Sequence, residues 1–253
     1  MRPYEQREFT IGSVVGESLT LYRRFFLRFF LVAVLVYAVV GIPTAMEGQA
    51  SSDRGRAIWL AIALIVDIVG FALVQGALVD TVDDVRDGKL DSQLGDVYDR
   101  ARRRVPQIVG LAFLLGVIVG VLVAGLVVLG AVAHVTALGI VVALVLALFL
   151  LTRWAVAMPV VMLEDIGPWS AMNRSYRLVD GHSFRVFWTL VVSGIMAGVL
   201  SLIVTGILRA IVHGFIGTWL GSVIASGVTT PFIAIVGALM YFHLRPLAAP
   251  APA

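Results

Sequence analysis

Two ionisable side chains stand deep inside long apolar stretches, Asp67 and Arg153, and they are the first candidates for chemistry. Each lies about ten residues from the nearer end of its stretch, which at 1.5 Å per helical residue is about 15 Å. Ionisable groups buried that deeply in a membrane are costly, and they usually face other protein groups or a wet cavity. We therefore predict an intramembrane ion pair between Asp67 and Arg153 that locks helix packing. The alternatives are that the pair moves a proton or substrate, or that the two residues never meet.

A second group of polar residues follows the fourth apolar stretch. Glu164 comes at the end of that stretch, and Arg174 and Arg177 lie on the next polar segment. These arginines can reach back to Glu164 or outward to lipid phosphates, because the planar guanidinium matches the geometry of both carboxylate and phosphate oxygens. We predict a structural clamp between Glu164 and Arg174. A binding site for anionic lipid headgroups is the alternative.

Residue patterns that would indicate an enzyme are absent from the sequence. The four histidines do not have the spacing of a zinc-binding helix, the chain has no cysteine, and the acidic run over 80–91 lacks the spacing of a calcium loop. No phosphate-binding loop or nucleophile elbow occurs. We expect no catalytic residues, no metal and no cofactor.

The composition explains why so few polar residues are available. Of the 253 residues, 60% are hydrophobic and 14% are charged, with a mean hydropathy of +0.98. Soluble domains are about 45–50% apolar and about 25% charged. These values exclude a soluble globular protein, a disordered chain and a nucleic-acid-binding protein, and they indicate an integral membrane protein.

Six apolar segments are long enough to cross a bilayer as helices, since a crossing takes roughly 20 residues. A β-barrel is excluded because residues 139–151 contain no polar side chain and cannot alternate. The predicted fold is an all-α bundle with one domain over 1–245 and a flexible Pro/Ala tail over 246–253. The predicted spans are about 25–46, 57–80, 107–133, 137–163, 184–212 and 217–244.

Basic residues are distributed unequally between the two ends of these spans. Fifteen of the nineteen lie in the N-terminal segment, in the second and fourth links, and in the tail. Basic residues favour the cytoplasmic side of a membrane protein. We therefore expect a multi-pass protein of the cell membrane with both termini in the cytoplasm.

Three polar segments on the same side resemble one another. They begin at Ser13, Ser92 and Ser170, residues suited to cap a helix, and each continues with apolar residues at helical spacing. This pattern predicts three amphipathic interfacial helices, each followed by a pair of spans. The similarity indicates either three pseudo-repeats or only the polar links that any protein with an even number of spans requires.

The most distinctive sequence motif lies over 153–185. It contains Arg153 with Trp154, Pro159, Glu164, the pair Arg174-Ser175 and Gly181. This run resembles the bacterial family named after the membrane domain of glycerophosphoryl diester phosphodiesterases. The resemblance implies a multi-span membrane domain with these motif residues. It does not imply phosphodiesterase activity, because the catalytic barrel of the fused members is missing from this sequence.

We therefore expect a polytopic membrane protein of the non-catalytic type. Its role would be that of an accessory, scaffold or assembly component, with membrane lipids as partners, anionic headgroups among them, and no nucleic acid. The alternative function is a transporter or channel for a small solute or lipid that uses the Asp67/Arg153 pair. A membrane-embedded lipid enzyme is the third candidate.

Overall fold

The computed structural model describes residues 9–47, 51–86, 94–212 and 214–247. Over these residues the chain is helical with short turns and without a strand. Six stretches are long and apolar enough to cross a membrane, which confirms the predicted all-α fold with six spans. The described helices are α1 (Ile11–Arg24), α2 (Phe26–Glu47), α3 (Asp53–Arg86), α4 (Leu94–Val132), α5 (Thr136–Arg153), α6 (Ala157–Glu164), α7 (Pro168–Val179), α8 (Ser183–Ile211) and α9 (Gly214–Leu247).

The last helix, α9, is the centre of the bundle. It is the most buried of the six candidate spans and packs against α2, α8, α1 and α3. Its inner face includes the fully buried Ile235, Leu239 and Tyr241. The stabilisation gained by burying such side chains between helices comes from close packing, because lipid tails are as apolar as the side chains themselves.

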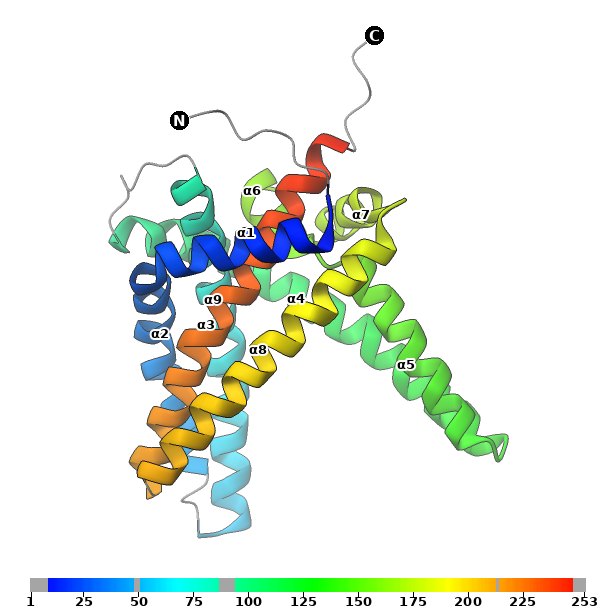
Figure 1. The fold of residues 1–253 in the computed structure, drawn as a ribbon. Coiled ribbons are helices and arrows are strands. Elements are labelled where there is room, and N and C mark those ends of the chain that lie inside the picture. Colours follow the sequence, from blue (N-terminus) through cyan, green and yellow to red (C-terminus); the bar gives the residue numbers. More distant parts are fainter. Residues whose placement is uncertain (1–8, 48–50, 87–93, 213, 248–253) are drawn as a thin grey trace.

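Three shorter helices, α1, α6 and α7, lie across one end of the spans, together with the end of α9 (Figure 1). We call this the polar end of the molecule. Helix α1 turns a narrow face inward, with Val14, Ser18, Leu21 and Tyr22 buried. Their helical spacing is that of an amphipathic helix resting on a core. The first residues of α1 and the last of α9 share this end, as an even number of spans requires.

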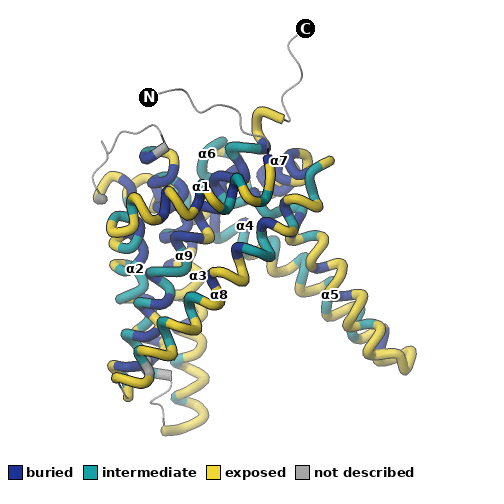
Figure 2. The backbone as a smooth tube through the Cα atoms, in the orientation of Figure 1, coloured by how far each residue is buried: buried dark blue, intermediate teal, exposed yellow. Residues whose placement is uncertain are grey.

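Helices α4 and α5 form a hairpin that diverges from the rest of the bundle (Figure 1). Close approach within the hairpin depends on Gly139, where a Cβ atom would lie 2.7 Å from the carbonyl oxygen of Leu126. The outward surfaces of the hairpin and of α8 are exposed along most of their length (Figure 2). Val132 and Leu202 are more than two-thirds exposed. Such apolar surface is expected where a helix faces lipid.

The structure differs from the predicted element boundaries at the polar segments. Thr10 caps α1, and Ser13 is the third helical residue, whose hydroxyl completes a capping box. Helix α7 begins at Pro168, so Ser170 lies inside it rather than capping it. Proline is favoured at a first helical position, which explains the earlier start. Ser92 lies outside the described residues.

The second polar segment is not a separate interfacial helix, because residues from Leu94 run directly into the span as part of α4. Pro106 falls inside this helix. Pro246 and Leu247, assigned to the flexible tail, belong to α9. The remainder of that tail, 248–253, lies outside the described residues.

One hydrogen bond holds α1 against the central helix, and it provides a test of this packing. The Tyr22 hydroxyl donates to the carbonyl oxygen of Val228, 2.7 Å away. Tyr22→Phe keeps the ring and removes the donor, so we expect a loss of about 1 kcal/mol in the free energy of unfolding in detergent. Tyr176→Phe is the control, because the exposed Tyr176 hydroxyl makes no hydrogen bond within the described part of the chain.

The same tyrosine predicts a pH dependence. Burial raises the pKa of Tyr22 from 10.0 to about 12. Because the fold favours the neutral Tyr22 hydroxyl, this group contributes stability that is present in full below pH 10 and is lost as the pH rises through about 12. We expect alkaline unfolding to begin at lower pH in the wild type than in Tyr22→Phe. Equal alkaline midpoints would contradict the packing of α1.

Candidate functional site

The distinctive motif is built around a break in the fourth span. Helix α5 ends at Arg153 and α6 starts at Ala157. Pro159 explains the position of the break, because a proline ring clashes with the carbonyl four residues earlier, here that of Ala155, and supplies no N–H donor. The break leaves the Arg153 carbonyl without its helical partner. The buried Ser175 hydroxyl of α7 donates to that carbonyl over 3.0 Å.

The Arg153 side chain is held by three groups at the polar end. Its Nη1 donates to an Asp180 carboxylate oxygen 2.8 Å away, just past the end of α7. Its guanidinium carbon lies 4.6 Å from the centre of the Tyr176 ring and 5.3 Å from that of Phe149. The side chain is only 14% exposed. The Arg153 guanidinium lowers the pKa of the Asp180 carboxyl by hydrogen bonding and charge, so this carboxyl stays ionised.

The structure does not bring Asp67 and Arg153 together, so the predicted pair is wrong. Asp67 is exposed on α3 and makes no ion pair or hydrogen bond within the described residues. The physical reason is the break after Arg153. Because the helix does not continue straight through 154–163, Arg153 lies beside α7 at the polar end rather than near the middle of the bundle.

The structure places Glu164 and Arg174 in contact, as the clamp prediction requires. Arg174 Nε lies 3.2 Å and 3.3 Å from the two carboxylate oxygens of Glu164. The Tyr241 hydroxyl of α9 donates to Glu164 Oε1 over 3.0 Å. One carboxylate therefore joins α6, α7 and α9. Sequence reasoning missed Tyr241, which lies in an apolar stretch and carries no charge to mark it.

A third ion pair connects the motif to α4. Asp165 ends α6 in the left-handed conformation, with a φ of 53°, and its carboxylate pairs with Arg104. Aspartate adopts this conformation more readily than most residues. The pair ties the polar end of α4 to the link between α6 and α7. The basic cluster before the third span gave a sequence signal for Arg104, but nothing indicated Asp165 as its partner.

Arg177 differs from the other arginines of the motif. It is exposed and forms no ion pair or hydrogen bond within the part of the chain that the structure describes. It borders a cleft of about 410 Å³ at the polar end, where α7 approaches the end of α9. The residues that line this cleft are Arg174, Arg177, Leu178, Asp180, His182 and Leu247.

Most of these contacts lie within a part of the chain that matches a known family, although Arg104 and Leu247 lie outside it. Residues 129–242 match the family model of the membrane domain of glycerophosphoryl diester phosphodiesterase. The match confirms the resemblance seen in the sequence. It runs from the end of α4 through most of α9 and includes the break after Arg153, Glu164 and Asp180. No curated protein and no solved structure matches the chain.

The charged side chains of the motif and of the adjoining α4 neutralise one another. Arg153, Arg174 and Arg104 each face a carboxylate, and the helices joined are α4, α5, α6, α7 and α9. Within the described residues no group of three or more His, Asp or Glu side chains is placed to hold a metal ion.

Removal of the Ser175 hydroxyl tests the role of the break. Ser175→Ala leaves the Arg153 carbonyl without a donor in a buried setting, and we expect a loss of about 1–3 kcal/mol in the free energy of unfolding. Ser170→Ala, on the exposed start of the same helix, is the matched control. Equal unfolding free energies for the two variants would contradict a structural role for this hydrogen bond.

A double-mutant cycle measures the clamp. Glu164→Gln keeps an acceptor for Tyr241 but removes the charge that faces Arg174, and Arg174→Gln removes the other charge. We expect a coupling energy of about 1 kcal/mol from unfolding in detergent, because the two groups touch. The matched cycle pairs Glu164→Gln with Arg177→Gln and should be additive. Additivity in the first cycle as well would rule out the clamp.

Proposed function

We propose that this protein is a non-catalytic, multi-pass component of the cell membrane that acts as an accessory or assembly factor and holds anionic phospholipids at its polar end. Its termini would then lie in the cytoplasm, since the polar end carries most of the basic residues. In this role the internally paired polar end is a structural platform.

The observation that carries this proposal is that two of the motif arginines are ion-paired and the third is not. Arg153 and Arg174 are bound to carboxylates and hold helices together. Arg177, on the same helix as Arg174, forms no ion pair with a carboxylate among the described residues, and it borders an open cleft. An exposed guanidinium at a membrane interface is a natural partner for a lipid phosphate.

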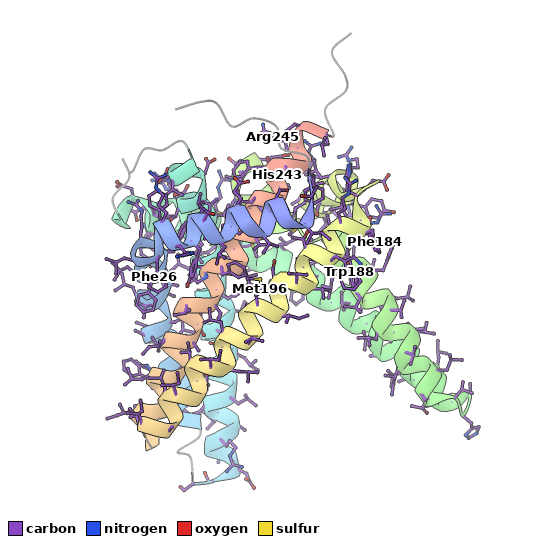
Figure 3. The ribbon with its side chains drawn as sticks, viewed as in Figure 1. Phe26, Phe184, Trp188, Met196, His243 and Arg245 are labelled. Carbon is purple, nitrogen blue, oxygen red and sulfur yellow. The ribbon has the colours of Figure 1, made fainter. Side chains whose placement is uncertain are left out.

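The aromatic residues near this end support the same orientation in a bilayer. Trp169 of α7 and Phe184 and Trp188 of α8 are exposed, and the last two are seen near the start of α8 (Figure 3). Aromatic side chains are enriched where the hydrocarbon meets the headgroups. Arg177 therefore lies on a helix that belongs to the headgroup level.

The transporter alternative loses its geometric basis. It required Asp67 and Arg153 to meet near the middle of the bundle, whereas Arg153 is bound to Asp180 at the polar end. Asp67 lies on α3 and takes no part in this ion pair.

Lipid retention in mild detergent tests the proposal. A basic residue near an anionic surface contributes about 1 kcal/mol, which corresponds to about a fivefold change in binding. We expect Arg177→Ala to retain about fivefold less phosphatidylglycerol than the wild type by native mass spectrometry. Retention of the zwitterionic phosphatidylethanolamine should be unchanged.

The matched control is Arg54→Ala, an exposed arginine near the start of α3 and away from the polar end. This variant should keep wild-type phosphatidylglycerol retention. Equal loss in both variants would show only a general charge effect, and no loss in either would remove Arg177 from the proposed lipid contact.

A further inference from the structure

One face of α3 carries a heptad stripe along its whole length. The positions are alternately three and four residues apart, the spacing that brings two helices together along a common seam. In the half of α3 nearer the polar end, the stripe residues Val74, Leu78, Thr81 and Val85 are all buried. This half is covered by the helices that pack on α3 there, α4 and α6 among them.

The same stripe continues uncovered into the other half of α3. Its positions there are Leu60, Leu64, Asp67 and Phe71, and all four are exposed. Leu64 is 55% exposed, although Leu78, two heptads further along, is fully buried. The change coincides with the divergence of the α4–α5 hairpin from the bundle (Figure 1). We call the four uncovered residues the open seam.

A carboxyl in the open seam sets a chemical requirement on what covers it. Asp67 is close enough to Tyr37 for an electrostatic interaction between the two side chains. The Tyr37 hydroxyl accepts a hydrogen bond from Thr230, and no hydrogen bond joins Asp67 to either residue. Exposed to lipid, a carboxyl without a partner is costly. An occupant of the seam is therefore favoured if it brings a hydrogen-bonding group to the level of Asp67.

The chain's own hairpin does not meet this requirement. Between Gln107 and Thr136 the only side chain able to hydrogen bond is His134, which lies in the turn at the far end of the hairpin. Closure of the hairpin over the seam would bury Asp67 against apolar side chains. Burial of an unsatisfied polar group costs several kcal/mol in hydrocarbon.

We propose that the open seam is the interface with a second copy of this chain. Two copies inserted in the same direction have parallel α3 helices, so a twofold axis along the membrane normal places each seam residue opposite its equivalent. Asp67 then meets Asp67 of the second copy. Two close carboxyls share a proton, so one donates and the other accepts. Leu60, Leu64 and Phe71 supply the apolar contacts of the same heptad seam.

Cysteine cross-linking in native membranes tests the dimer, because the chain has no cysteine of its own. We expect Leu64→Cys to form a disulfide between two copies under mild oxidation. Leu202→Cys is the matched control, since Leu202 is highly exposed on α8 but lies outside the seam. Cross-linking at Leu202 that equals cross-linking at Leu64 would overturn the proposal.

Substitution of Asp67 separates the hydrogen bond from general apolar contact. In the Leu64→Cys background, Asp67→Leu should weaken association about tenfold, the size of one polar contact between membrane helices. Asp67→Asn should restore it, because an amide both donates and accepts. Undiminished cross-linking with Asp67→Leu would overturn the proposed role of the carboxyl.

A paired variant detects the competing occupant. Leu64→Cys combined with Ile118→Cys reports whether α4 closes over the seam, since Ile118 continues the face of α4 that packs on the core. We expect disulfides between copies to dominate. A disulfide within one chain as the main product would assign the seam to the hairpin and overturn the dimer.

Discussion

The structure of the polar end depends on one backbone constraint, the Arg153 carbonyl that the helix break leaves without a helical partner at the end of α5. A buried carbonyl without a hydrogen-bond partner is costly, so the protein must provide a donor. The Ser175 hydroxyl does so from α7. This one contact requires α7 to lie across the end of α5, and that position places the charged residues of α7 next to those of α5 and α6.

The ion pairs follow from this placement. Once α7 is in position, Arg153 reaches Asp180 and Arg174 reaches Glu164, with Tyr241 completing the acceptors of that carboxylate. Each pair neutralises a charge that would otherwise be costly near hydrocarbon. The resulting platform joins the diverging α4–α5 hairpin to the central α9. The hairpin and the half of α3 farther from the polar end then have apolar faces that no other described part of the chain covers.

Much of the fold could be predicted because it follows from local composition. The six spans were visible as long apolar runs, and α1 and α7 as amphipathic segments rich in arginine. The contact between Glu164 and Arg174 was also within reach, since the two residues are ten apart with a turn between them. The predicted pairing of Asp67 with Arg153 is wrong because the depth of Arg153 follows from residue spacing only in a straight helix. The break before Pro159 interrupts that helix and places Arg153 at the polar end.

The sequence by itself determined that the chain spans a membrane, how many times it crosses, and which end is rich in charge. These properties depend on the free energy of transfer of each segment into hydrocarbon, which is a sum over neighbouring residues. The tertiary structure alone decided which charges meet and which faces stay open. Arg153 and Asp180 are 27 residues apart, and Glu164 and Tyr241 are 77 residues apart. Such partners are selected by the geometry of a helix break and by packing around α9, and neither is encoded in a local pattern.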